Sequence, residues 1–194
     1  MDKRIENATA LILRKLTGMH ASREYYEYYY NSMRETFMQK QYMWLAQKAK
    51  GKTVIDLGAQ TGDSAIYFLQ HGAKHVIAYE PDPYAFAMLE KNTKGKRVLS
   101  SRRKAPEPFE MLYEPYFLDI LYKPFVIKCD IEGNEHQVFT GNADLHNCIA
   151  LQIEYHHGPQ RIPMILKSKG FKVKVSEPYD ASGLGEVGWI YAWR

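Results

Sequence analysis

Two apolar segments in the second half of the chain are followed by side chains that can take up a proton. Asp130 and Glu132 come at the end of the first segment, and Glu154 and His156 at the end of the second. Each pair is two positions apart, so its side chains share a face if the backbone stays extended. Imidazole has the unperturbed pKa best suited to this task near neutral pH. We therefore expect His156 to act as a general base, with Asp130 or Glu132 orienting it or acting directly.

The same residues have a second chemical use and a purely structural interpretation. Two or three carboxylate oxygens and an imidazole could hold Mg²⁺ or a similar divalent ion, although we do not favour a metal here. Alternatively, Glu132 and Gly133 only shape a turn, and Glu135 only serves the first turn of a helix. Cys129 alternates with Asp130 and should point into the core, which argues against a cysteine nucleophile.

An earlier segment has the pattern of a cofactor loop. An apolar run leads into Asp56, and the loop after it reads Leu57-Gly58-Ala59-Gln60-Thr61-Gly62. The pattern D-x-G-x-x-x-G differs from the G-x-G-x-x-G of dinucleotide folds, and the P-loop lysine is missing. A carboxylate here would repel a pyrophosphate but attract a cationic amino group. S-adenosylmethionine has an amino group and a sulfonium and no phosphate, so we expect it to bind at Asp56, Gly58, Ala59, Gln60 and Gly62.

A second acid supports the same cofactor. Glu80 ends the next apolar run, 24 positions after Asp56, and Pro81 and Asp82 follow it. An acid at this place in a doubly wound sheet can accept hydrogen bonds from both ribose hydroxyls, so Glu80, Pro81 and Asp82 join the expected cofactor site. The plainer alternative is that the glycines serve a tight turn and Glu80 only begins a helix.

These motifs together resemble the FkbM family of S-adenosylmethionine-dependent methyltransferases. The resemblance covers roughly residues 53–157: the loop at 55–63, the segment Ala78-Tyr79-Glu80-Pro81-Asp82-Pro83, and Ile153-Glu154-Tyr155-His156. Its hallmark K-x-D-x-E-G-x-E is matched by Lys128-Cys129-Asp130-Ile131-Glu132-Gly133-Asn134-Glu135. It implies a class I methyltransferase fold and usually an O-methyltransferase activity.

The elements that must position these residues alternate between strand and helix from residue 53 onward. This order predicts an α/β fold with a doubly wound, mostly parallel, Rossmann-like sheet, in which ligands bind at the carboxyl ends of the strands. The chain should close with a C-terminal antiparallel hairpin. Predicted strands cover residues 53–57, 75–79, 97–100, 125–131, 149–155, 171–175 and 187–193, and predicted helices cover 63–70, 82–91, 135–139 and 160–169.

Residues 1–50 are expected to form a helical extension to a methyltransferase domain at 51–194. Apolar spacing predicts one helix over 2–17 and one or two more over 22–50. Five of the chain's 15 tyrosines crowd into residues 25–30. This cluster could fold over the strand ends as a lid, although a packed helix interface is the more ordinary interpretation.

Composition limits the remaining possibilities. The 194 residues are 45% hydrophobic and 25% charged, typical of a globular protein, and no run is long or apolar enough to span a membrane. The N-terminus lacks the pattern of a signal peptide, and two cysteines cannot build a disulfide framework. We therefore expect a cytoplasmic protein without a membrane partner.

The acceptor of the methyl group is the least determined property. Acids lining the pocket argue against a phosphate beside the reacting atom, so a hydroxyl of a sugar, glycan or small metabolite fits best. The main alternative is RNA, because residues 91–104 carry seven basic side chains and no acid. A third possibility is a protein that binds the cofactor without catalysis.

Overall fold

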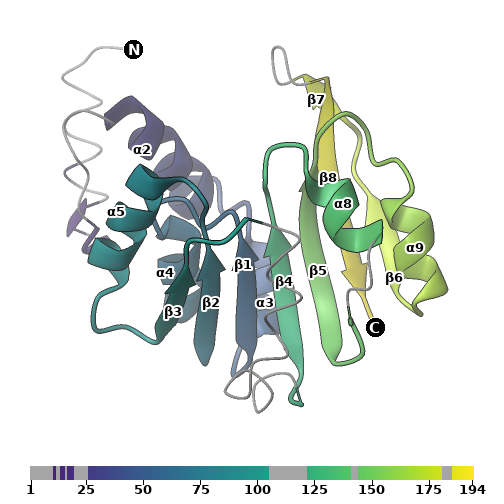
Figure 1. Cartoon of the computed structure of the whole chain (residues 1–194), viewed down its shortest axis with the longest axis horizontal. Helices are drawn as coiled ribbons and strands as arrows, with labels where there is room; N and C mark the ends of the chain where they lie inside the picture. The colour runs from purple at the N-terminus through teal and green to yellow at the C-terminus, as the bar shows by residue number, and fades with distance from the viewer. Residues whose placement is uncertain are drawn as a thin grey trace.

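A twisted sheet forms the centre of the molecule and runs continuously from one edge to the other (Figure 1). The computed structural model describes residues 11, 14, 15, 17–19, 26–104, 122–140, 144–180 and 185–194. The strands lie in the order β3 (Val98–Ser101), β2 (His75–Tyr79), β1 (Thr53–Leu57), β4 (Phe125–Cys129), β5 (Cys148–Tyr155), β8 (Glu186–Trp193) and β6 (Lys172–Val175).

The sheet is parallel from β3 to β5 and antiparallel beyond. The chain builds β1, β2 and β3 outward in one direction and then returns to place β4 on the other side of β1. The strand order therefore reverses between β1 and β4, which is where doubly wound sheets bind ligands. The predicted C-terminal hairpin is confirmed, with the short β7 (Tyr179–Asp180) also paired with β8.

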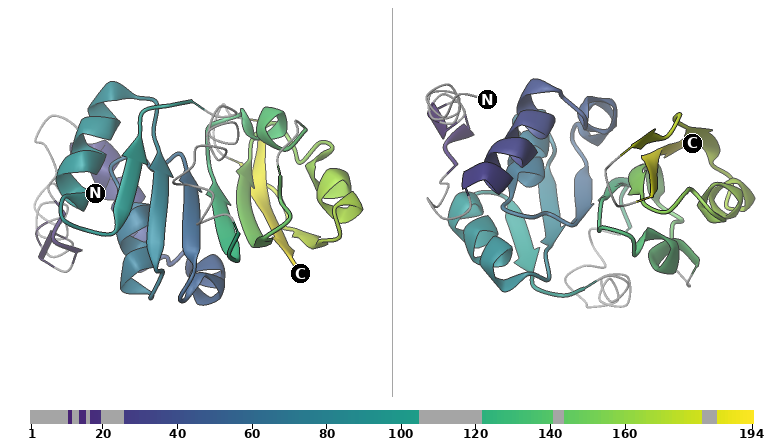
Figure 2. Two further views of the ribbon diagram at one scale, coloured as in Figure 1. Left: turned by 60° about the horizontal axis from the view of Figure 1, so that its bottom comes forward. Right: turned by 90° about the horizontal axis from the view of Figure 1, so that it is seen from above.

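Helices cover both faces of the sheet, so the fold has three layers (Figure 2). One face packs against α3 (Met43–Ala49), α4 (Asp63–Gln70) and α5 (Pro83–Thr93). The other face packs against α8 (Glu135–Thr140) and α9 (Ile162–Ser168). Every residue of β1 and β4 is buried, as expected for strands covered on both sides. These observations confirm the predicted α/β class.

The N-terminal region approaches the strand ends from the α3 side. A helix α2 (Tyr26–Met33) continues into a π-helical turn, η2 (Arg34–Met38), and then into α3. Leu45 and Ala46 of α3 share a hydrophobic cluster with Val54 of β1 and Val126 of β4. Most of the helix expected at 2–17 lies outside the described residues, as does Tyr25 of the tyrosine cluster. No helix among the described residues is long and apolar enough to cross a bilayer.

Most predicted elements are present with ends shifted by a few residues, and one shift matters for the site. The strand expected over 125–131 ends at Cys129, because the chain turns immediately afterwards. Glu132 has a positive φ of 56° and Gly133 one of 102°, both outside the region of extended strand backbone. Asp130 and Glu132 therefore lie on a turn after the strand and not on an extended strand end.

Candidate active site

The loop after β1 is held tightly against its neighbours. The N–H groups of Gly58 and Ala59 both donate to the carbonyl of Tyr79, at 3.0 and 2.9 Å. Gly58 has a φ of 78°, and a Cβ at this position would lie 1.8 Å from the carbonyl oxygen of Asp130. Only glycine fits such a close approach. The loop therefore brings the carboxyl ends of β1, β2 and β4 together.

Glu80 ties this loop to the one that follows β2. Its buried carboxylate accepts hydrogen bonds from the backbone N–H of Gln60 at 2.8 Å and of Asp82 at 2.9 Å. Burial raises the pKa of Glu80, although both hydrogen bonds oppose the rise. Asp82 itself is exposed and caps α5 by accepting from the N–H groups of Tyr84 and Ala85.

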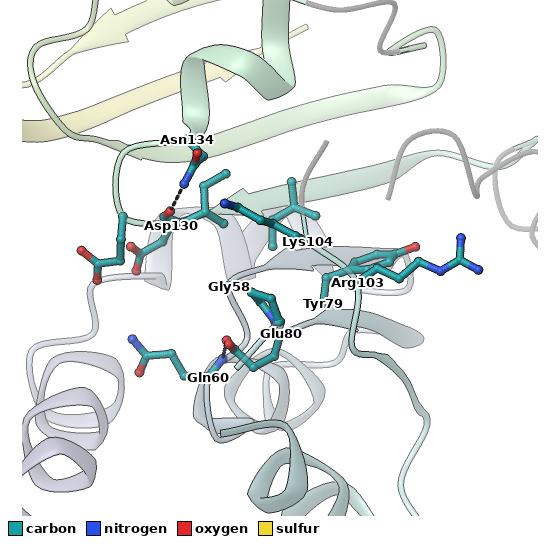
Figure 3. A pocket seen from close by; sticks show the side chains of 12 residues that line it. Gly58, Gln60, Tyr79, Glu80, Arg103, Lys104, Asp130 and Asn134 are labelled. Atoms are coloured by element: carbon teal, nitrogen blue, oxygen red, sulfur yellow. Dashed lines mark hydrogen bonds between the residues drawn. The ribbon is translucent and has the colours of Figure 1, made fainter. Parts of the chain in front are cut away.

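A cleft of about 200 Å³ opens at these strand ends (Figure 3). Gly58, Gln60 and Glu80 lie on one side of it, and Asp130 and Asn134, which follow β4, lie on the other; Pro81 also lines the cleft. Lys104 reaches across the cleft toward the Asp130 end, whereas the side chain of Arg103 extends away from it (Figure 3). A smaller hollow beneath η2 is lined by Tyr42, Glu35 and Asp63 and shares three lining residues with the cleft: Gly58, Gln60 and Asp130.

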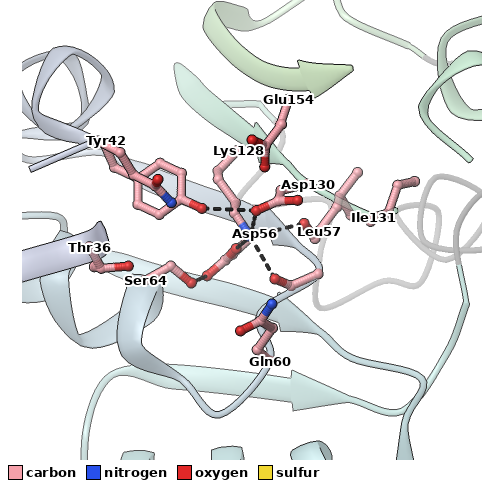
Figure 4. A network of polar contacts seen from close by, with 12 residues as sticks. Thr36, Tyr42, Asp56, Leu57, Gln60, Ser64, Lys128, Asp130, Ile131 and Glu154 are labelled. Atoms are coloured by element: carbon pink, nitrogen blue, oxygen red, sulfur yellow. Dashed lines mark hydrogen bonds and ion pairs between the residues drawn. The ribbon is translucent and has the colours of Figure 1, made fainter. Parts of the chain in front are cut away.

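Beneath the loop lies a buried ion pair that we did not predict from the sequence (Figure 4). Lys128 Nζ lies 3.3 Å from Asp56 Oδ1 and donates to the carbonyl oxygen of Gly58 at 2.5 Å. The hydroxyl of Ser64 donates to the other oxygen of Asp56 at 2.6 Å. Burial raises the pKa of Asp56 against the lowering effect of Lys128. Burial lowers the pKa of Lys128, but the surrounding carboxylates raise it overall. Asp56 is fully buried and pairs with Lys128 and Ser64, and its expected contact with a bound amino group stays a prediction.

Asp130 lies at the meeting point of the two hollows. It accepts a hydrogen bond from the hydroxyl of Tyr42 at 3.1 Å, and Lys128 Nζ is 3.9 Å away (Figure 4). Glu154 lies beside it, and burial together with the charge of Asp130 raises the pKa of Glu154. The hydroxyl of Tyr179, on β7, donates to Glu154. The C-terminal hairpin thus reaches the same edge of the sheet.

His156 meets a different set of carboxylates. Its Nδ1 lies 3.1 Å from Glu135 Oε1, and its Nε2 lies 3.4 Å from Glu132 Oε2. Glu135 is buried at the start of α8 and accepts from the N–H groups of Ile131 and Gly133 as well. Burial lowers the pKa of His156, but the hydrogen bond to Glu135 and the nearby carboxylates raise it overall. Glu135 therefore does more than serve the first turn of a helix.

The structure brings the expected catalytic residues together by a different route from the one we predicted. One atom each of Asp130, Glu132 and His156 lie within 4.8 Å of one another. The turn at Glu132 achieves this, and not the alternation of an extended strand. Cys129 is fully buried in the core, as expected, and His157 next to His156 is exposed.

Several residues of this site had a signal in the sequence that could have been used. Lys128 is a charged residue inside an apolar strand and lies two positions before Asp130, so an extended backbone would place both on one face. A buried lysine requires a buried carboxylate, and Asp56 is the acid on the neighbouring strand. Tyr42 and Tyr179 had no such signal, because their positions depend on tertiary packing.

The basic segment lies beside the cleft. All seven basic residues between 91 and 104 are exposed, and the last two of them, Arg103 and Lys104, line the cleft. They follow β3 at the edge of the sheet. The segment therefore offers positive charge at one side of a cleft whose other side carries Asp130 and Glu132.

Comparisons with known proteins point to methyltransferases. No protein-family model matches the chain, so the FkbM resemblance is not supported by such a match. A ribosomal protein L11 methyltransferase from Legionella pneumophila (strain Corby) is 30% identical over 106 residues, which are 53% of this chain and 35% of that protein. The chain thus spans about a third of the length of this relative.

Solved structures share the fold at low sequence identity. The 23S rRNA methyltransferase ErmE has a TM-score of 0.58 at 13% identity, covering 80% of this chain and 68% of its own. TrmK of M. capricolum, in complex with S-adenosylhomocysteine, has a TM-score of 0.58 at 15% identity, covering 81% and 67%. Precorrin-6y C5,15-methyltransferase from Geobacter metallireducens GS-15 has a TM-score of 0.55 at 15% identity, covering 80% and 87%. The chain therefore has the class I methyltransferase fold.

Proposed function

We propose that this chain is an S-adenosylmethionine-dependent methyltransferase that acts on a hydroxyl group. The observation that carries the proposal is the shared cleft, which joins the glycine loop and Glu80 to Asp130 and Glu132. A cofactor-binding half and a proton-accepting half thus meet in one space. The class I fold and the FkbM-type motifs support the same function.

The residues of the cleft fit this cofactor better than a nucleotide phosphate. Glu80 keeps free lone pairs for ribose hydroxyls, since its two oxygens each accept a single backbone hydrogen bond from the described residues. Gly58, Ala59, Gln60 and Gly62 would shape the floor of the site, with Pro81 and Asp82 at its rim. Asp56 would contribute through Lys128, which holds the Gly58 carbonyl.

The acidic half would position the acceptor and take up its proton. When bound, S-adenosylmethionine supplies an already activated methyl group, so the chain needs mainly alignment and a proton acceptor. Asp130, Glu132 and His156 supply carboxylate and imidazole acceptors within one small space. Such acceptors suit the O–H of a sugar, glycan or small metabolite.

A pair of glycine variants tests the cofactor site. Gly58→Ala should reduce S-adenosylmethionine binding in calorimetry at least tenfold, because its Cβ would collide with the backbone of Asp130. Gly95→Ala is the matched control: Gly95 has a similar φ of 74°, but nothing lies within 4 Å of its Cβ position. Equal affinities in the two variants, both folded by thermal unfolding, would sink the assignment.

A second experiment separates catalysis from binding. Asp130→Asn should retain cofactor affinity while transfer of a labelled methyl group to hydroxyl acceptors falls at least a hundredfold. Wild-type protein that binds the cofactor but methylates no acceptor in a broad screen would instead favour a non-catalytic binding protein.

RNA is the second candidate acceptor, and a specific observation favours it. Arg103 and Lys104 place positive charge on the wall of the cleft, in continuity with the exposed basic segment. Positively charged grooves of this kind track a nucleic-acid backbone. Charge reversal at Arg103 and Lys104 tests this alternative, because an RNA acceptor would lose phosphate contacts there.

A further inference from the structure

The environment of His156 contains an unusual juxtaposition of two hydrogen-bond acceptors. Glu135 accepts from two backbone N–H groups and can only accept from the ring, so Nδ1 of His156 carries the proton that it donates. In the neutral ring Nε2 is then a bare lone pair. Among the described residues, the polar group that faces it is the carboxylate of Glu132, at 3.4 Å. Two acceptors at this distance need a proton or a metal ion between them.

The bridge can be a proton, on the ring or on the carboxyl of Glu132, or a metal ion. The position of Asp130 favours a metal ion, because one of its carboxylate oxygens lies within 4.8 Å of the ligand atoms of Glu132 and His156. A proton can be shared by only two of these atoms, whereas a metal ion can bind all three. At bond lengths of about 2.1 Å, ligand atoms on opposite sides of an ion are about 4.2 Å apart and adjacent ones about 3.0–3.4 Å apart, so the three atoms would have to draw together on binding. Glu132, whose side chain is 61% exposed, is free to make this movement.

We propose that Asp130, Glu132 and the Nε2 atom of His156 bind a divalent first-row metal ion, with Glu135 as the residue that orients the imidazole. Metal-binding histidines commonly donate their second ring N–H to a carboxylate, which fixes the tautomer and the ring plane. Glu135 has this relation to His156 and is buried, so the arrangement is present before any ion arrives. One imidazole with two carboxylates favours Mn²⁺ over Mg²⁺.

The site lies at the mouth of the cleft, which gives the ion a further partner. Asp130 and Glu132 both line the cleft, so the coordination positions left by three protein ligands face it. An oxygen-bearing acceptor could occupy one of them. Binding of the metal depends only on these side chains and not on the proposed function. With the ion bound, Nε2 of His156 no longer takes up a proton, so that role would pass to the uncoordinated carboxylate oxygens of Asp130 and Glu132.

Titration with Mn²⁺ in the absence of S-adenosylmethionine tests the site. Calorimetry of the metal-stripped chain should show one Mn²⁺ per chain, with Mg²⁺ binding at least tenfold more weakly. Glu132→Ala and His156→Ala should each weaken Mn²⁺ binding at least tenfold, and Glu135→Gln should weaken it 10- to 100-fold. His157→Ala is the matched control, because this exposed neighbour should leave the affinity unchanged.

Failure of the metal site and failure of the proposed function give different results, because Mn²⁺ binding is measured without S-adenosylmethionine. Glu132 is exposed, so its variant keeps the test valid even if His156→Ala does not fold. Absence of Mn²⁺ binding at millimolar concentration would mean that a proton bridges His156 and Glu132, and the metal site would be wrong. Binding that survives Glu132→Ala and Glu135→Gln unchanged would overturn it equally. Binding of S-adenosylmethionine is measured separately and bears only on the cofactor site.

Discussion

Lys128 shows how one residue can organise a site that it does not enter. Its ammonium group contacts the Gly58 carbonyl oxygen, Asp56 and Asp130, so its charge is paired with groups of the glycine loop, of β1 and of the turn after β4. A buried charge is tolerated only when it is paired. The position of the cofactor loop is therefore coupled to the charge state of the residues below it.

Removing this charge should be costly. Lys128→Met keeps most of the side-chain volume but leaves Asp56 without its cation, and we expect a loss of about 3–5 kcal/mol in the free energy of unfolding. The double variant Lys128→Met/Asp56→Asn should recover part of that loss. Lys123→Met, at an exposed position, is the control and should change stability by less than about 0.5 kcal/mol. Urea denaturation measures all three, and a double variant no more stable than Lys128→Met would contradict the pairing.

At the scale of the element, α5 depends on a cap that also belongs to the predicted cofactor site. Asp82 accepts from two N–H groups of the first turn of α5, and Pro83 follows it. Asp82→Ala should cost about 0.5–2 kcal/mol in the free energy of unfolding, whereas Asp82→Asn should retain most of the stability. Comparing cofactor affinity in the folded Asn variant with that of wild type then shows whether the carboxylate itself contacts the cofactor.

The pairing of β5 with β8 includes a close contact across the strands. Gly188 lies opposite Tyr155, and a Cβ on Gly188 would be 2.5 Å from the hydroxyl oxygen and 2.7 Å from Cζ of that ring. Gly188→Ala should therefore destabilise the fold by about 1–3 kcal/mol. The strand β7, which pairs with β8, holds Tyr179 in its hydrogen bond to Glu154, so Gly188→Ala should also disturb the candidate site around Glu154.

A double-mutant cycle checks this explanation. Tyr155→Phe removes only the hydroxyl and should rescue little, since the ring carbon remains in the way. Tyr155→Leu should relieve the clash, so that adding Gly188→Ala costs less in this background than in wild type. Chemical denaturation gives the coupling energy, and purely additive effects would show that the contact does not explain the glycine.

Local patterns predicted the strands and helices of this fold, because buried parallel strands read as short apolar runs. The same patterns also placed Gly58 and Glu80 at strand ends, where the structure has them. They could not show how Asp130, Glu132 and His156 meet, because that depends on the turn at Glu132 and on Glu135 from α8. Nor could they show the π-helical turn or the reach of Tyr42, which depend on how the N-terminal helices pack on the sheet.

At the scale of the whole molecule, the net charge of +4 conceals a strong separation. Residues 1–50 carry a net +4 and residues 91–104 a net +7, so the rest of the chain carries −7. The positive charge next to the cleft is thus local and lies on exposed side chains, whereas the negative charge includes the cluster at the strand ends. An extended anionic acceptor and a small neutral one would respond differently to this arrangement.

Reversing charge at two matched places distinguishes the acceptors. The variant Arg103→Glu/Lys104→Glu alters the wall of the cleft, and Lys94→Glu/Lys96→Glu makes the same charge change at exposed positions that do not line it. For an RNA acceptor, the first variant should weaken binding of single-stranded RNA and make the dependence of log affinity on log salt concentration shallower by about 1.4, at about 0.7 per lost phosphate contact. The second variant should change this slope less, because its positions are outside the cleft.

For a small hydroxyl acceptor, wild-type protein should show weak RNA affinity. Methyl transfer by both variants should then stay close to wild type, since neutral substrates gain nothing from these charges. Two measurements separate these outcomes: filter binding across a salt series, and labelled methyl transfer to RNA and to small hydroxyl compounds. RNA methylation that persists in Arg103→Glu/Lys104→Glu would show that these two residues do not belong to the acceptor site.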